Sequence, residues 1–267
     1  MDNNGIWHDE ESVIQTIVVD YFSQLFQSSS SGRGPASLDM VEPYVTSSMN
    51  DSLTPKFTKL EVKQAIFQMY PTKAPSPDGM PPLFFQKYWH IVGNDVSRAI
   101  IDFLSTSHLL RKINFTHMVL IPKVPHPKDM TQLRPISLCN VLFKIASKSR
   151  RRGSKDFLAL KLDMSKAYDI IEWNFLEQMM LKLGFAAPWV SLIMECVTTV
   201  AYSVLVNGSG CGYLNPSRGL RQGDPLSPYL FLLYTQGFST HLAHTLALII
   251  PPLYTGFLNL SGPCGKD

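Results

Sequence analysis

Apolar residues recur at helical spacing along the first hundred residues of the chain. Residues 6–27 carry them near every third or fourth position, which predicts an amphipathic helix. A second helix is expected over residues 59–70, because Thr58 is followed three residues later by Glu61, the spacing of a capping box. Helical periodicity returns over residues 83–110. The N-terminal part of the chain is therefore expected to be helical.

Strand-like patterns follow. Residues 115–124 (FTHMVLIPKV) predict a strand with an outward lysine, and residues 134–148 predict a short strand and then the start of a helix. Residues 157–163 (FLALKLD) have a nearly continuous apolar character. That character is expected of a strand in a sheet covered by helices.

Two further helices and a hairpin are expected in the second half. Apolar spacing predicts helices over residues 173–183 and 189–200, with Gly184 ending the first and Pro188 suited to the first turn of the second. Residues 201–214 predict a hairpin that turns at an Asn-Gly pair.

The order of elements indicates the fold class. Asp169 and Glu172 have capping-box spacing ahead of the helix over residues 173–183, and another helix is expected over residues 225–233. Helices and strands are interspersed, with one clear hairpin and no internal repeat. This favours an α+β fold over a regular βαβ repeat.

Composition adds a question about partners. The 267 residues carry a net charge of +3, and length alone suggests one or two domains. The charge is uneven: residues 1–59 hold eight acids and three bases, and residues 103–161 hold twelve bases and two acids. A basic middle fits a polyanionic partner. A solvated basic face is the alternative, and the sequence leaves both open.

Other classes of protein are disfavoured. The four cysteines show no CxxC spacing, so neither a disulfide scaffold nor a zinc site is expected, and a reducing compartment is the default. The start MDNNGIWHDEE is acidic, unlike a signal peptide, and no apolar run has membrane-spanning length. We expect an intracellular location, nuclear or cytoplasmic, and no membrane partner.

Asp163 is the first candidate for chemistry. It ends the apolar run ALKLD, and the aromatic Tyr168 follows five residues later. A carboxylate at the end of a buried strand suits Mg²⁺, which prefers oxygen ligands. Taken alone, such an aspartate is more often a turn or cap residue.

Two other segments could bind phosphate. Lys123 and Arg134 flank a proline-rich loop, either as two cations held over a triphosphate or as two solvated bases on a hairpin. In RGLRQGDPLSP (218–228), glycines allow a ligand to approach the backbone ahead of a helix start. Surface loops look the same, and neither GxxxxGK nor GxGxxG before a helix is present.

Four ordered motifs carry a resemblance to a known family. KAPSPDGMPPLFFQKYW, LIPK…LRPISL, LALKLDMSKAYD…EW and RGLRQGDPLSPYLF resemble the reverse transcriptase of plant LINE-type (non-LTR) retrotransposons. The resemblance implies the fingers and an incomplete palm of a right-hand polymerase. It further implies a helical N-terminal extension (1–70), partial fingers (71–155), a partial palm (156–242) and an unrelated tail (243–267).

The resemblance also implies roles for residues. Asp163 would be the first catalytic aspartate and a Mg²⁺ ligand, and Tyr168 the aromatic steric gate under the sugar. Lys123 and Arg134 would clamp the triphosphate. Nucleotide and template contacts would come from Arg221, Gln222 and Gly223. An RNA template, a DNA primer and deoxynucleoside triphosphates would be the partners. Apart from the resemblance, the basic cluster over residues 148–155 (Arg150, Arg151 and Arg152 within it) is a candidate contact to nucleic acid.

The chain departs from the family in three places. The family carries its other catalytic acids in an Ala-Asp-Asp hairpin after RQGDPLSP, yet residues 225–266 contain neither Asp nor Glu. A fingers stretch expected between residues 148 and 157 is absent, and Ser76 stands where the family usually has Gly. We therefore expect a truncated, catalytically inactive remnant that retains nucleic-acid binding. The alternative is an active enzyme whose Ala-Asp-Asp segment lies in an unannotated downstream exon.

Overall fold

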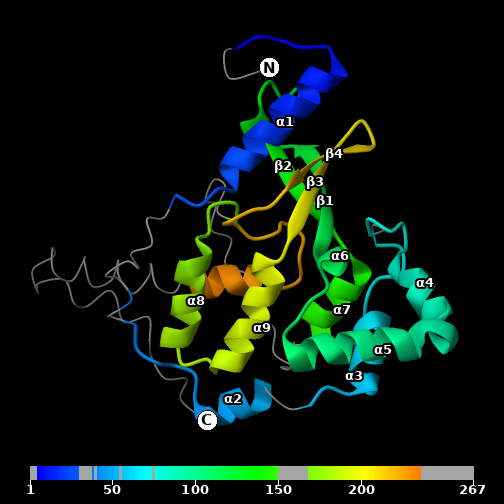
Figure 1. The fold of residues 1–267 in the computed structure, drawn as a ribbon, viewed down its shortest axis with the longest axis vertical. Coiled ribbons are helices and arrows are strands. Elements are labelled where there is room, and N and C mark those ends of the chain that lie inside the picture. Colours follow the sequence, from blue (N-terminus) through cyan, green and yellow to red (C-terminus); the bar gives the residue numbers. More distant parts are fainter. Residues whose placement is uncertain are drawn as a thin grey trace, which may run out of the picture.

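A mixed four-stranded sheet forms the centre of the structure (Figure 1). The computed structural model describes residues 5–29, 38, 41–53, 56–73, 76–149 and 168–235. The strands are β1 (Phe115–Pro122), β2 (Leu133–Cys139), β3 (Ala201–Val206) and β4 (Ser209–Leu214), in the order β2-β1-β3-β4. β1 runs antiparallel to β2 and parallel to β3, and β3 runs antiparallel to β4. The α+β prediction is confirmed.

The predicted hairpin is confirmed, and its turn has the backbone shape that its sequence predicts. Asn207 and Gly208 have positive φ values of 50° and 83°. Two successive positive values mark a turn whose twist matches the twist of the flanking strands, and Asn-Gly is the pair that adopts it most easily. β3 and β4 therefore pair tightly, with a register irregularity between Tyr202 and Val204.

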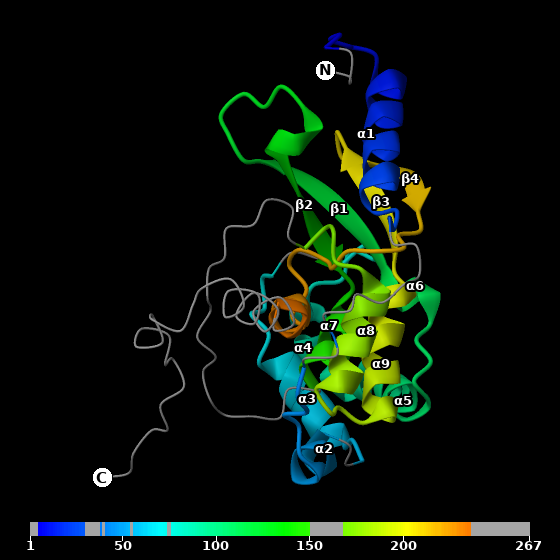
Figure 2. The same cartoon turned by 90° about the vertical axis from the view of Figure 1, so that its left-hand side faces the viewer.

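Helix α1 (Glu11–Leu25) covers one face of this sheet. Figures 1 and 2 show it lying along β3 and β4. Val18 and Phe22 of α1 pack with Met118 of β1 and Val204 of β3 in one buried cluster. Phe22 is 1% exposed, and burying a side chain of that size stabilises the fold by about 1.5–3 kcal/mol. The helix predicted over residues 6–27 is thus confirmed with shorter ends.

Most of the remaining helices form a larger core beside the sheet. Val62, Ile100, Phe143 and Leu176 are all buried within it. The helices are α2 (Ser47–Leu53), α3 (Lys59–Phe67), α4 (Pro82–Lys87), α5 (Trp89–Thr106), α6 (Arg111–Asn114), α7 (Val141–Ser149), α8 (Trp173–Lys182) and α9 (Ala187–Thr198), followed by helical residues 227–235. Helix α2 contributes no buried residue to this core.

Helix boundaries follow local chemistry in most places. The capping box at α3 is confirmed: Thr58 N donates to Glu61 Oε2 at 2.8 Å, and Glu61 N donates to Thr58 Oγ1 at 3.3 Å. The helical periodicity predicted over residues 83–110 corresponds to two helices, because the backbone of Tyr88 leaves helical geometry between α4 and α5. Gly184 follows the end of α8, as predicted, at a φ of 93°.

The capping box predicted at Asp169 and Glu172 is wrong. Helix α8 begins at Trp173, so Glu172 is itself the residue before the helix and makes no side-chain cap. Its carboxylate accepts hydrogen bonds from Ser28 Oγ at 2.5 Å and from Arg218 at 3.4 Å. Partners distant in sequence therefore outcompete the local cap.

Several predictions lie outside the described residues. They concern the strand over residues 157–163 with its Asp163, the three arginines Arg150, Arg151 and Arg152, and the tail from residue 243. The four predicted domains stay predictions, although one sheet takes β1 and β2 from residues 71–155 and β3 and β4 from residues 156–242. In the part of the chain that is described, no helix is both long and apolar enough to cross a membrane.

Candidate functional site

Residues 218–224 form a loop that is fixed at both sides. Gly219 N donates to Ile171 O at 2.7 Å, and Leu220 N donates to Tyr168 O at 2.6 Å. On the other side, Ser137 N of β2 donates to Gln222 O at 2.8 Å. The loop thus bridges the segment before α8 and the strand β2, and backbone bonds set its path.

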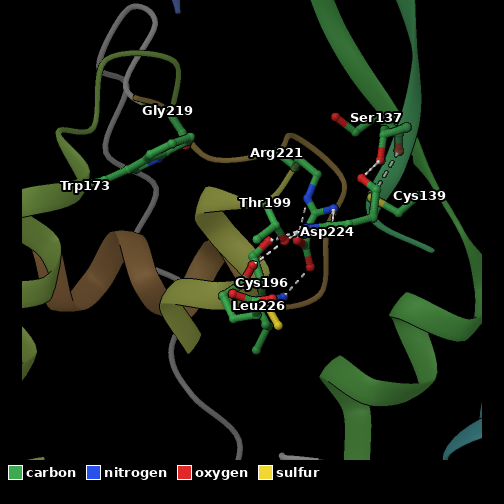
Figure 3. Close-up of polar contacts among 12 residues, drawn as sticks. Ser137, Cys139, Trp173, Cys196, Thr199, Gly219, Arg221, Asp224 and Leu226 are labelled. Atoms are coloured by element: carbon green, nitrogen blue, oxygen red, sulfur yellow. Dashed lines mark hydrogen bonds and ion pairs between the residues drawn. The ribbon is translucent and has the colours of Figure 1, made fainter. Parts of the chain in front are cut away.

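Arg221 holds the loop from inside (Figure 3). Its side chain is 4% exposed and pairs with Asp224, whose Oδ2 lies 3.1 Å from Arg221 Nε. The guanidinium also donates to Asn114 Oδ1 and to Cys196 O, and it lies 3.7 Å from the centre of the Phe143 ring. These contacts satisfy a buried charge, as its burial requires.

Asp224 links Arg221 to the next helix. Its Oδ1 accepts a hydrogen bond from Leu226 N at 2.8 Å, at the start of helical residues 227–235 (Figure 3). A carboxylate at this position satisfies a backbone donor that the helix leaves unpaired. The helix expected over residues 225–233 is confirmed, and its first turn is tied to the loop.

Gln222 has a side chain with a defined orientation. Its Nε2 donates to Asp169 Oδ1 at 2.9 Å, and Asp169 is 4% exposed. An ionised carboxylate only accepts hydrogen bonds, so the NH₂ end of the Gln222 side chain must face Asp169. The side-chain carbonyl oxygen of Gln222 therefore points away from Asp169 and can accept hydrogen bonds from other groups.

Tyr168, Gln222 and Gly223 line one cavity of about 500 Å³. Lys73, Lys148, the Asp224-Pro225 pair and the first turn of helical residues 227–235 complete its wall. Tyr168 stacks on Phe231 with ring centres 5.0 Å apart, and burial raises the pKa of Tyr168. The cavity is in the size range of small-molecule sites and is open to solvent.

Ser76 and Asp78, which follow α3 in the chain, contact the residues at the start of α7. Ser76 Oγ accepts a hydrogen bond from Val141 N at 2.7 Å, and Asn140 Nδ2 donates to Asp78 Oδ2 at 3.3 Å. Asn140 Oδ1 also accepts from Leu142 N at 2.8 Å. Ser76, the departure from the family pattern, thus caps the first turn of α7 and helps to anchor the loop that carries Lys73.

Lys123 and Arg134 lie elsewhere, near the far end of the β1–β2 pair. Arg134 is paired in register with Ile121, and Lys123 directly follows the last residue of β1. Both are exposed, and Lys123 Nζ donates to Thr131 O at 2.7 Å. Neither lines the cavity. Their predicted role as a triphosphate clamp stays a prediction.

The carboxylates beside the cavity already have partners. Asp169 accepts from Gln222, and Asp224 pairs with Arg221. Among the described residues there is no group of three or more His, Cys, Asp or Glu that could hold a metal ion. Asp163, the predicted Mg²⁺ ligand, lies outside the described residues.

Three of the cavity residues, Tyr168, Gln222 and Gly223, are predicted from the sequence. Lys73 also lines the cavity and is not predicted to do so. The sequence groups Lys148 with the basic cluster over residues 148–155, whereas the structure brings this side chain to the same cavity as Lys73. The motif that begins at Lys73 carries part of the family resemblance, but the sequence assigns no nucleotide contact to Lys73 itself. Since its neighbour in space is 75 residues away, no sequence spacing could pair the two lysines.

Residues 121–251 match the protein family described as reverse transcriptase (RNA-dependent DNA polymerase). This part of the chain is therefore similar to reverse transcriptase domains. It includes Lys148, Tyr168, Gln222 and Gly223 of the cavity, and Lys73 lies before it.

The chain is also similar to proteins of transposable elements. The Transposon TX1 uncharacterized 149 kDa protein of Xenopus laevis is 24% identical over 73% of this chain. The Retrovirus-related Pol polyprotein from type-1 retrotransposable element R2 of Popillia japonica is 30% identical over 36% of it. The uncharacterized mitochondrial protein AtMg01250 of Arabidopsis thaliana is 63% identical over 13% of it. The chain spans only 18%, 16% and 29% of these proteins, respectively.

Proposed function

We propose that the chain binds a deoxynucleoside triphosphate in the cavity beside Tyr168 and Gln222. The observation that carries the proposal is the convergence of Tyr168, Gln222 and Gly223, from two distant segments, on one cavity of about 500 Å³. These are residues that the resemblance assigns to nucleotide binding. An aromatic ring and a fixed amide acceptor suit the sugar of a deoxynucleotide, which offers an apolar face and one hydroxyl donor.

We further propose that the domain derives from a non-LTR retrotransposon and, as this polypeptide, adds no nucleotides. The relation to the R2 and TX1 proteins supports the origin. The inactivity follows from charge: a polymerase-type site uses two metal ions, and residues 225–266 supply no Asp or Glu to join Asp163. An RNA template and a DNA primer are the partners we expect to bind. Without a full set of ligands, Mg²⁺ is held poorly.

The alternative is an active polymerase completed by a downstream Ala-Asp-Asp segment. The four sequence motifs favour it, because they stand in the order that an intact reverse transcriptase has. Sequencing the transcript and the genomic DNA 3′ of the Leu242 codon separates the two ideas. An Ala-Asp-Asp-encoding segment in any frame supports the alternative.

Two measurements on the purified chain test the proposal. Calorimetric titration with dATP should show binding that Gln222→Ala weakens. Gln178→Ala should leave binding unchanged, because the Gln178 side chain donates to Asn174 on α8 and does not line the cavity. Primer extension with Mg²⁺ should give no incorporation in either the wild type or Asp163→Asn. Incorporation by the wild type that Asp163→Asn abolishes would contradict the inactivity, and absence of dATP binding would contradict the nucleotide site.

A further inference from the structure

Two lysines from different elements meet at the cavity. Lys73 comes from the loop after α3, and Lys148 comes from the last turn of α7. Lys148 Nζ donates to Gln68 O at a long 3.5 Å, which holds the ammonium group at the margin of the cavity. A lysine ammonium carries three donors and is a recurrent ligand of phosphate groups.

A third lysine lies behind them. Lys144 is one turn before Lys148 on α7 and is 4% exposed. Burial lowers the pKa of Lys144, and the nearby charge of Lys73 lowers it further. Asp224 and Asp78 act in the opposite direction. Lys144 therefore lies within electrostatic reach of both Lys73 and Asp224, two residues of the cavity wall.

The carboxylates near the cavity do not cancel this positive charge. Asp224 is neutralised by Arg221 at 3.1 Å, whereas Asp78 and Asp169 accept hydrogen bonds from neutral amides. Within the described part of the chain, the cations around the cavity outnumber these three acids, and they are Lys73, Lys144, Lys148 and Arg221. The field inside the cavity favours an anion.

We propose that Lys73 and Lys148 form a phosphate-binding subsite of this cavity. The ligand is a phosphate group, either of a nucleoside triphosphate or of the backbone of a bound strand. The subsite is distinct from Lys123 and Arg134, which lie near the far end of the β1–β2 pair and do not line the cavity. The proposal rests on the proposed function only for the nucleotide to which the phosphate belongs.

Calorimetric titration with tripolyphosphate, without divalent cations, tests the subsite directly. Lys73→Ala/Lys148→Ala should lose about tenfold in affinity for each lysine removed, the usual size of a charged hydrogen bond. Lys63→Ala/Lys87→Ala is the matched control: it removes two lysines that lie over the rings of Phe67 and Tyr88, 5.7 and 5.6 Å from the ring centres. That control should bind like the wild type, and Lys73→Arg/Lys148→Arg should retain most of the affinity. Thermal melts confirm that each variant is folded.

Further titrations separate the inference from the proposed function and identify the phosphate source. If tripolyphosphate binding depends on Lys73 and Lys148 but dATP binds no more tightly than tripolyphosphate does, the subsite stands and the nucleotide proposal fails. If dATP binding is lost in Lys123→Ala/Arg134→Ala, and Lys73→Ala/Lys148→Ala binds dATP, tripolyphosphate and a ten-nucleotide strand like the wild type, the subsite is overturned and the nucleotide proposal stands. Weakened binding of a ten-nucleotide strand with unchanged dATP affinity assigns the phosphate to a strand. Wild-type chain that takes up no tripolyphosphate, or a double alanine variant that binds as well as wild type, refutes the subsite.

Discussion

Neighbouring residues of the RGLRQGD segment occupy different surroundings in the structure. Gln222 reaches the cavity, whereas its neighbour Arg221 points into the protein and pairs with Asp224. The resemblance predicts both as nucleotide contacts, and that role is untested for either. We infer that Arg221 acts by positioning the loop, since its guanidinium is engaged by Asp224, Asn114 and Cys196.

Removing the Arg221 side chain should destabilise the fold strongly. Arg221→Ala leaves the Asp224 carboxylate buried without its partner, which typically costs about 3–5 kcal/mol. Urea denaturation of the wild type and variant measures the loss in unfolding free energy. Arg98→Ala is the control, because the Arg98–Asp95 pair at 3.2 Å is 78% and 80% exposed at its two side chains and should contribute little. Equal stability of Arg221→Ala and wild type would contradict the positioning role.

At the scale of elements, the end of α1 and the 218–224 loop hold each other in place. Arg218 Nε donates to Leu25 O at 2.9 Å, and Arg218 N donates to Phe26 O at 3.1 Å. The same arginine pairs with Glu172 at 3.4 Å, ahead of α8. The last carbonyl groups of α1, which a helix leaves unpaired, thus find donors in the loop. The helix that covers the sheet is thereby coupled to the loop that forms the cavity.

Gly219 is the residue that allows this loop to approach so closely. Its φ is 93°, and a Cβ there would lie 2.9 Å from the backbone oxygen of Asp169. Gly219→Ala should therefore lose at least about 1–3 kcal/mol of unfolding free energy, from strain and from the clash. Gly208→Ala has a similar φ of 83° but open space around the added carbon, so it should cost less. Denaturation curves of the two variants compare them; a smaller loss for Gly219→Ala would refute the close-packing argument.

At the scale of the whole molecule, the sheet joins segments that are distant in sequence. Phe115 of β1 is paired with Ala201 of β3, so a parallel pair brackets the segment that contains α7, α8 and α9. The cavity takes its walls from the loop after α3, from α7, from Tyr168 and from residues 222–229. The net charge of +3 does not predict where positive charge gathers in the structure, because half of the basic residues lie between residues 103 and 161.

Nucleic-acid affinity should depend on the salt concentration and on the basic connector, which is the basic cluster over residues 148–155. For a single strand, the slope of log affinity against log salt becomes shallower by about 0.7 for each phosphate that the protein no longer neutralises. Arg150→Ala/Arg151→Ala/Arg152→Ala should therefore weaken RNA binding and flatten its salt dependence, measured by fluorescence anisotropy at several salt concentrations. Arg98→Ala/Arg111→Ala/Lys112→Ala removes three cations outside the connector and serves as a control. A slope unchanged by the connector variant would show that these arginines do not touch the RNA.

Much of the fold is predictable because local chemistry decides it. The Asn-Gly turn, the Thr58–Glu61 capping box and the stop at Gly184 need only neighbouring residues, and all three predictions are confirmed. The false capping box at Asp169 and Glu172 shows the limit. There, Ser28 and Arg218, more than 40 residues away, supply partners for Glu172 that outcompete the local arrangement.

The sequence by itself determined the family motifs, the α+β class and the identity of Tyr168, Gln222 and Gly223 as candidates. Only the tertiary structure decided that these three share a cavity with Lys73 and Lys148, and that Arg221 is buried. The physical reason is that periodicity and capping act over a few residues, whereas a cavity wall and a buried ion pair are made by backbone paths that the sheet and the packed helices bring together.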